Sequence, residues 1–180
     1  SGRGGRGNST FLKEEIFKPL GMDDTQFYVS DAEAERLATV YQPDGNGGIE
    51  AIPATNGMRS QGLYIDGPNI SFSGGAGLTS TANDYARFLQ MTLNGGQLDG
   101  ERILSRKTIE LMTTNHLGNI PFRAGQGFGL GFYVVTDLGL RGSLGSVGEY
   151  GWGGAYHSTY WVDPEEELVV VYLTQIIPAT

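Results

Sequence analysis

The chain has 180 residues, a length typical of one domain, and its 39% hydrophobic and 11% aromatic content argue against disorder. The net charge of −8 argues against nucleic acid and anionic membranes as partners, and no apolar run reaches the roughly 18 residues of a membrane span. Zero cysteines exclude disulfides and thiolate metal sites, and the two histidines lie too far apart for a zinc site, so we expect no metal or other cofactor. The sequence leaves the cellular compartment open.

The chain begins with a glycine- and arginine-rich segment, residues 1–8, which we interpret as a flexible tail or an expression remnant. A short basic arm for nucleic acid is the weaker alternative. A helix follows from Ser9 or Thr10, because apolar residues recur there at helical spacing, and Pro19 and Gly21 end it.

Three further features precede the middle of the chain. Ser30 and Glu33 form a capping-box pattern that predicts a second helix, with apolar residues recurring through Tyr41. Residues 43–48 are rich in Pro, Asp, Asn and Gly and predict a turn. Residues 49–70 have poor periodicity and indicate a long surface excursion, in which one short strand is allowed.

The middle of the chain predicts two helices and a strand. Thr81 and Asp84 form a capping box for the first helix, which Gly95 and Gly96 end, and Ser105 caps the second. In residues 125–132, glycines alternate with large apolar residues, which predicts a strand whose bare face admits another backbone.

The last 30 residues predict a β-hairpin. Residues 168–173 are a continuous apolar, β-branched run, so we expect a central strand that is buried on both faces. Residues 156–162 supply its partner strand, and Asp163 and Pro164 begin the turn. Helices followed by antiparallel strands indicate an α+β fold, an antiparallel sheet with flanking helices.

Trp152, Gly153 and Gly154 stand where the first hairpin strand begins, and they are unusual there because glycine weakens a strand. They either pack a tryptophan beside a softened strand or offer bare backbone N–H groups to a substrate carbonyl. The chain contains no G-x-S-x-G, H-E-x-x-H or P-loop motif, so residue chemistry leaves both interpretations open. By residue chemistry alone, His157 fits a structural role better than a direct one.

Four segments resemble the serine β-lactamase-like hydrolases, a superfamily of class C β-lactamases, penicillin-binding DD-peptidases and family VIII carboxylesterases. The segments occur in the family's order, at residues 11–22, 73–89, 129–132 and 151–164 with 171–175. The resemblance implies a partial β-lactamase/transpeptidase-like fold, with residues 9–180 forming the C-terminal portion of the hydrolase domain.

The resemblance also implies roles for individual residues. Trp152-Gly153-Gly154 falls where the family has Lys-Thr-Gly or its W-x-G and H-x-G variants, so Ala155 would offer its backbone N–H as an oxyanion donor. Tryptophan in place of the motif lysine favours esters over carboxylate-bearing β-lactams. Four more residues would line or border the cleft: Tyr156, His157, Ser73 and Gly74.

The family's nucleophile and base come from an S-x-x-K motif, and no serine in this chain has lysine three residues later. We therefore expect the parent protein to be a serine hydrolase of esters or amides that forms an acyl-enzyme, and the isolated chain to be inactive. We also expect exposed sheet edges that a companion fragment or a second copy covers. The alternatives are a non-catalytic binding or assembly module and a fragment of a DD-peptidase or β-lactamase acting on small β-lactam or peptide substrates.

Overall fold

The computed structural model describes residues 8–53, 65 and 77–178, and the chain divides into two compact units. The sheet unit comprises Tyr85–Gly154 and Thr159–Tyr172. The N-terminal unit comprises Ser1–Asp84, Ala155–Ser158 and Leu173–Thr180. Each unit is described by itself.

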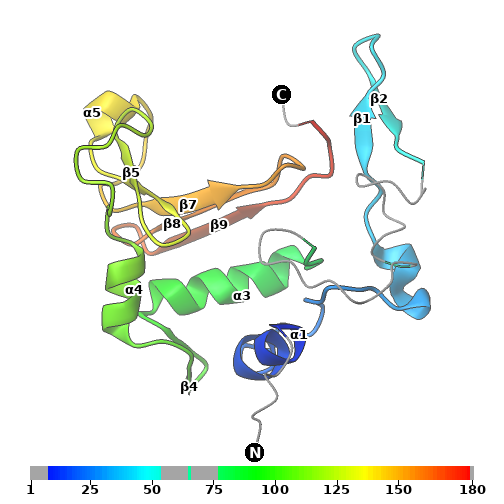
Figure 1. Ribbon diagram of the computed structural model, residues 1–180, viewed down its shortest axis with the longest axis horizontal. Helices are drawn as coiled ribbons and strands as arrows, with labels where there is room; N and C mark the ends of the chain where they lie inside the picture. The colour runs from blue at the N-terminus through cyan, green and yellow to red at the C-terminus, as the bar shows by residue number, and fades with distance from the viewer. Residues whose placement is uncertain (1–7, 54–64, 66–76, 179–180) are drawn as a thin grey trace, which may run out of the picture. The chain divides into compact units, whose positions relative to one another are not determined.

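The sheet unit is built on a five-stranded antiparallel sheet in which each strand pairs with its neighbour in sequence (Figure 1). Its strands are β5 (Gln126–Phe128), β6 (Tyr133–Val135), β7 (Tyr150–Gly153), β8 (Thr159–Asp163) and β9 (Leu168–Tyr172). With the helices of the same unit, this sheet confirms the predicted α+β class.

The predicted hairpin is β8 and β9. The buried carboxylate of Asp163 accepts the backbone N–H groups of Glu165 and Glu166, which fixes the turn. The expectation that the second strand is central and buried on both faces is wrong for the described part of the chain. There β9 pairs only with β8 and lies at the end of the sheet, and Leu168 and Tyr172 are exposed. An apolar run shows that a strand is apolar but not where it lies in the sheet.

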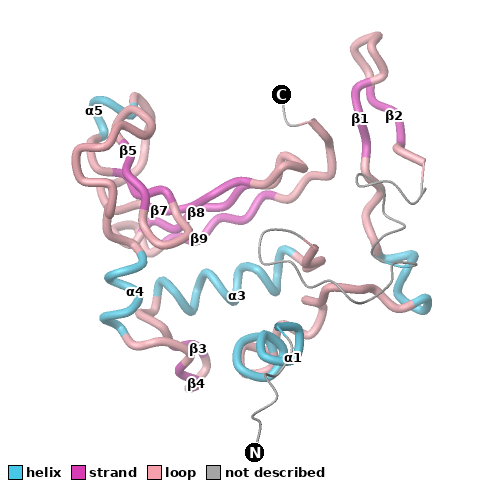
Figure 2. The backbone as a smooth tube through the Cα atoms, in the orientation of Figure 1, coloured by secondary structure: helices cyan, strands magenta, loops and turns pink. Residues whose placement is uncertain are grey.

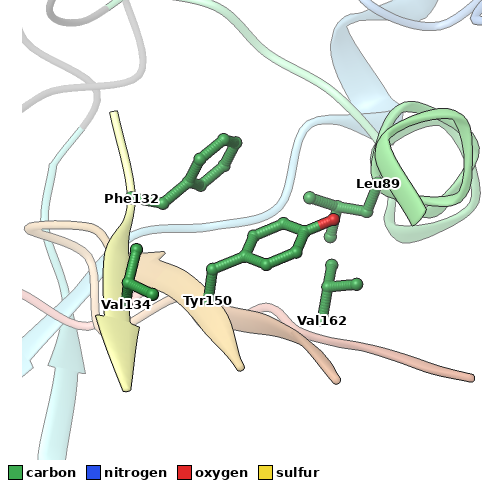
Figure 3. Packing of buried hydrophobic residues seen from close by; sticks show 5 residues of the cluster. All are labelled: Leu89, Phe132, Val134, Tyr150 and Val162. Atoms are coloured by element: carbon green, nitrogen blue, oxygen red, sulfur yellow. The ribbon is translucent and has the colours of Figure 1, made fainter. Parts of the chain in front are cut away.

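The core of the sheet unit lies between the sheet and helix α3 (Ala82–Leu93), which runs along one face of the sheet. Figure 3 shows the Tyr150 ring among the side chains of this core, with its hydroxyl directed toward α3. The hydroxyl lies 2.8 Å from Thr92 Oγ1, and Thr92 in turn donates to the Leu89 carbonyl. This contact satisfies a buried phenol that burial would otherwise penalise. The buried cluster is Leu89, Phe132, Val134, Tyr150 and Val162.

The N-caps predicted at Thr81 and Ser105 are confirmed, but the Thr81–Asp84 capping box forms only in half, because the Asp84 carboxylate accepts from the Asp24 N–H and from Thr25 Oγ1. The Asp84 N–H donates to Thr81 Oγ1 at the start of α3, and the Thr108 N–H donates to Ser105 Oγ at the start of α4 (Arg106–Met112). Helix α3 ends at a glycine pair with positive φ angles, as predicted. The short hairpin of β3 (Gln97–Leu98) and β4 (Glu101–Arg102) lies between these helices in the chain.

The single strand predicted over residues 125–132 is wrong, because the segment forms β5 and then turns into β6. The glycines still admit other groups closely. A Cβ on Gly129 would lie 2.1 Å from the Met112 carbonyl oxygen, and a Cβ on Gly127 would lie 2.2 Å from the Asn115 amide carbon. The alternation of glycines with large residues therefore indicates that other groups approach the backbone closely. Gly131, with a φ of 102°, turns the chain.

The N-terminal unit begins with α1 (Asn8–Leu12), which continues as a π-helical turn (Lys13–Phe17). This confirms the first predicted helix and buries Phe17, whereas Phe11 is exposed. The turn predicted at residues 43–48 joins β1 (Tyr41–Pro43) to β2 (Ile49–Ala51) in a hairpin (Figure 2). Residues 54–64 and 66–76 lie outside the described residues, so most of the expected surface excursion is not tested.

The second predicted helix is wrong beyond one short stretch. Asp31–Arg36 forms a 3-10 helix, and the Ser30 hydroxyl donates to the Glu33 carboxylate instead of capping a backbone N–H. The backbone then extends at Leu37, and the Tyr41 N–H donates to the Gln175 carbonyl. Pairing with a distant segment outweighs the local helical pattern.

Candidate functional site

Trp152 and Gly153 end the inner strand β7 and do not begin the hairpin strand β8, so their predicted place at a strand start is wrong. Strand β7 pairs with β6 on one side and β8 on the other, with Trp152 opposite Tyr160. Gly151 is buried so tightly that a Cβ there would lie 2.3 Å from the Tyr160 carbonyl oxygen. Beyond it, Gly153 and Gly154 are exposed. The glycines thus serve two purposes: Gly151 admits the neighbouring strand, and the later pair leaves the backbone open to solvent.

Ala155 follows directly and belongs to the N-terminal unit. It is exposed, and its backbone N–H has no hydrogen-bond acceptor among residues 8–53, 65 and 77–178. An exposed N–H without an acceptor, just beyond the glycine-rich end of a strand, is the kind of donor that an oxyanion requires.

The connection after Ala155 is held within the N-terminal unit. The Tyr156 carbonyl accepts from Thr174 Oγ1 at 3.0 Å and from the Ile176 N–H at 3.3 Å. Ser158 Oγ donates to the Thr174 carbonyl at 3.1 Å. His157 lies between these anchors, is exposed, and has a φ of 66°, a conformation unusual for a side chain larger than glycine. The anchored backbone therefore presents His157 to solvent.

The Trp152 side chain lies in an aromatic cluster of the sheet unit. The Phe122 ring is nearly parallel to it, at 15° with centroids 6.4 Å apart, and the Phe128 ring meets it edge-on at 5.0 Å. The Arg123 guanidinium carbon lies 5.2 Å from the centroids of both Phe122 and Trp152. We call Phe122, Arg123, Phe128 and Trp152 the aromatic–arginine cluster. Trp152 therefore packs, as one of the two sequence interpretations held, and also carries a cation on its face.

Sequence reasoning missed Phe122 and Arg123. They stand in a turn before β5, where the Gln126 N–H donates to the Arg123 carbonyl at 3.0 Å. Their only sequence signal is an aromatic–arginine pair immediately before a glycine-rich segment, which does not indicate the distant partner Trp152.

A buried ion pair fixes the start of β7. Glu149 is 2% exposed; its carboxylate pairs with Arg141 at 2.6 Å and accepts from Tyr133 Oη at 2.9 Å. The hydrogen bond to Glu149 raises the pKa of Arg141. Burial, and then the Glu149 charge, raises the pKa of Tyr133 far above its usual value. Both side chains therefore keep their protons and hold the loop between β6 and β7.

The predicted site residues fall into three groups. Trp152, Gly153 and Gly154 belong to the sheet unit, and Ala155, Tyr156 and His157 belong to the N-terminal unit. Ser73 and Gly74 lie outside the described residues. In the part of the chain that is described, His, Asp and Glu side chains form no cluster of three that would bind a metal. No described helix combines the length and apolar character needed to cross a membrane.

Comparison with known proteins gives several relatives that match most of this chain. A putative D-alanyl-D-alanine carboxypeptidase from Escherichia coli O157:H7 is 27% identical over 91% of the chain and 39% of its own length. Esterase EstB from Burkholderia gladioli is 30% identical over 88% of the chain and 42% of its own length. The chain thus spans about two fifths of the length of the curated relatives it matches.

A solved structure and a family sequence model agree with these relatives. The structure of EstCE1, described as a hydrolase with promiscuous acyltransferase activity, matches with a TM-score of 0.76 and 26% identity, covering 94% of this chain and 46% of that one. The family model described as Beta-lactamase matches residues 2–178. The chain therefore belongs to the Beta-lactamase family, with the β-lactamase/transpeptidase-like fold over part of that fold's full extent.

Proposed function

We propose that this chain is part of a serine hydrolase that cleaves esters or amides through an acyl-enzyme. The observation that carries the proposal is the exposed strand end at Gly153–Ala155, where the Ala155 N–H has no acceptor among the described residues. Such a donor would stabilise the oxyanion of an acyl-transfer transition state. The relatives named as an esterase and as a putative carboxypeptidase support this reaction type.

The nucleophile of the proposed reaction has to come from outside these 180 residues, because none of their serines stands in an S-x-x-K motif. In the proposal, Trp152, Gly153 and Gly154 form one wall of the substrate site. The proposal also assigns substrate-binding roles to Tyr156 and His157, and to Ser73 and Gly74, which lie outside the described residues. The chain alone turns over no substrate.

A companion segment or a second copy is also part of the proposal. Within the described residues the outer edge of β9 has no strand partner, and Leu168, Tyr172 and the following Leu173 are exposed. Exposed apolar edges of this kind recruit another strand or helix. The native mass of the active species would show whether a second chain accompanies this one.

Turnover of a 4-nitrophenyl ester tests the reaction. We expect hydrolysis by a longer protein that contains this chain and an S-x-x-K motif, inhibition by a serine-directed phosphonate, and no nitrophenol release from the 180-residue chain. A phosphonate-sensitive burst from the 180-residue chain would contradict the missing nucleophile. A non-catalytic module would give no turnover from either protein.

The backbone donor has its own test. Ala155→Pro removes the N–H, and we expect kcat to fall about 100-fold or more, the usual loss for one oxyanion-hole donor. Ala155→Ser keeps the N–H and should retain activity, with thermal melting of both variants showing that they fold. Equal activity in the two variants would remove Ala155 from the mechanism.

A DD-peptidase or β-lactamase is the second candidate, and the carboxypeptidase-like relative is the observation that favours it. Tryptophan at position 152 favours the esterase instead. Labelling of the active protein by a fluorescent penicillin would select the DD-peptidase or β-lactamase. Ester turnover without labelling would select the esterase.

A further inference from the structure

We infer that the aromatic–arginine cluster binds a carboxylate, so that the preferred ester or amide carries a carboxylate group. The inference rests on the proposed function for the reaction, but the binding site stands on the geometry of the sheet unit alone. Arg123, Phe122, Phe128 and Trp152 all belong to that unit.

The Arg123 guanidinium combines two ring contacts with N–H groups that have no acceptor among the described residues. A guanidinium that stacks on aromatic rings uses its flat face, and its N–H groups point outward in the guanidinium plane. Arg123 contacts both the Phe122 and the Trp152 rings at 5.2 Å, and its side chain is exposed. Among the described residues, no carboxylate or carbonyl accepts a hydrogen bond from its guanidinium.

The other described arginines differ in this respect. Arg36, Arg87, Arg106 and Arg141 each pair with a carboxylate. Arg102 donates to two backbone carbonyls and to Gln97. In a protein of net charge −8, an arginine that is fixed on two rings but has no anionic partner in the described part of the chain is a built site for an external anion.

The backbone at Arg123 is held by its own turn. Its carbonyl accepts the Gln126 N–H, and Gly125 in this turn packs so closely that a Cβ would lie 2.2 Å from the Asp137 carbonyl oxygen. Phe128 supports both stacked rings edge-on, at 5.5 Å from Phe122 and 5.0 Å from Trp152. A preorganised guanidinium loses little side-chain entropy on binding.

The ligand chemistry follows from these features. A carboxylate has two oxygens in one plane, which match two parallel N–H groups of the guanidinium. The flanking Phe122 ring, 39% exposed, offers apolar contact to the carbon part of the same molecule. A single cation in an acidic protein suits a monoanion better than the dianion of phosphate.

Binding to the 180-residue chain is the first test. We would titrate benzoate, its neutral isostere benzamide and inorganic phosphate while following the Arg side-chain and Trp indole N–H resonances by NMR. We expect saturable shifts at Arg123 and Trp152 with benzoate alone, and Trp161 on β8 serves as the internal reference. Equal binding of benzamide, or stronger binding of phosphate, would overturn the inference.

Variants locate the site. Arg123→Gln should weaken benzoate binding about 10-fold or more, the scale of one bidentate charge-assisted pair. Arg123→Lys keeps the charge without the planar fork and should fall between Gln and the unaltered chain. Arg106→Gln, at an exposed position of α4, removes the same charge elsewhere and should bind as the unaltered chain does. Thermal melting checks that each variant folds, and unchanged binding by Arg123→Gln would refute the inference.

Turnover separates this inference from the proposed function. In the active protein, Arg123→Gln should lower kcat/KM about 10-fold for 4-nitrophenyl hydrogen glutarate but less than about 2-fold for neutral 4-nitrophenyl pentanoate. Equal losses on both esters would overturn the carboxylate assignment and leave the hydrolase standing. Absence of turnover on both by the unaltered protein would refute the hydrolase, while the benzoate titration would still decide the binding site.

Discussion

Glu149 brings a carboxylate into the interior of the sheet unit immediately before β7. Arg141 and Tyr133 hold this carboxylate, and the Arg141 side chain itself is 15% exposed. A paired buried charge contributes little net stability over an apolar replacement, but an unpaired one is costly. Glu149, Arg141 and Tyr133 together therefore act by fixing the geometry of the loop that precedes Trp152.

Removing the charge of Glu149 tests this. Glu149→Gln leaves Arg141 without its anionic partner, and we expect the free energy of unfolding to fall by about 3 kcal/mol. Glu110→Gln is the matched control, because it breaks the exposed pair with Arg106 and Lys107 and should change stability little. Urea unfolding of the three proteins measures the difference. Equal small effects would mean that the Glu149 pair is dispensable.

At the scale of elements, the sequence predicted the caps and turns that depend on contacts between neighbouring residues. In these features a side chain accepts a hydrogen bond from the adjacent backbone, so the residue that makes the contact can be recognised in the sequence. They are the helix caps at Thr81 and Ser105, the turn at residues 43–48, which Asp44 holds, and the hairpin turn at Asp163. The helix expected after Ser30 failed because a distant carbonyl, that of Gln175, takes the Tyr41 N–H.

The candidate site divides in the same way. The sequence resemblance indicated Trp152, Gly153 and Gly154, and the unusual pair of glycines next to a predicted strand could be recognised from the residues alone. Arg123 was not visible, because its role depends on a strand about thirty residues away reaching the same face as its turn. Pairwise proximity across a sheet has no local signal in a single sequence.

Gly151 gives the element-scale prediction. Gly151→Ala would place a Cβ 2.3 Å from the Tyr160 carbonyl oxygen, so β7 and β8 must separate. We expect a loss of about 1–3 kcal/mol in unfolding free energy, as for other overpacked cores. Gly139→Ala is the control, since its Cβ meets only the Asp137 carboxylate, at 3.3 Å, and alanine favours the α5 helix (Leu138–Arg141). A stable Gly151→Ala protein would show that the strand pair is pliable.

At the scale of the molecule, four tyrosines link the stability of the sheet unit to alkaline pH. Burial raises the pKa of Tyr85, Tyr133, Tyr150 and Tyr160 above the usual value of about 10. Each group thus releases its proton more readily in the unfolded chain than in the folded one. The stability that they contribute is complete below about pH 10 and decreases as pH rises above it.

Unfolding experiments across pH 8–12 check this expectation. We expect the urea midpoint to fall above about pH 10, together with ionisation of tyrosine followed by absorbance at 295 nm. Tyr160→Phe should flatten this dependence, whereas Tyr172→Phe, at an exposed position of β9, should leave it unchanged. A midpoint independent of pH in this range would contradict the assigned cause.

The strand order has a consequence for how the sheet forms. Each strand from β5 to β9 pairs with the next strand along the chain, and the longest connection, from Val135 to Tyr150, contains the Arg141–Glu149 ion pair. Closing short loops costs little chain entropy, and local pairing is associated with fast folding. We therefore expect the sheet to be able to form from adjacent hairpins, because none of these five strands has to pair with a strand distant in sequence.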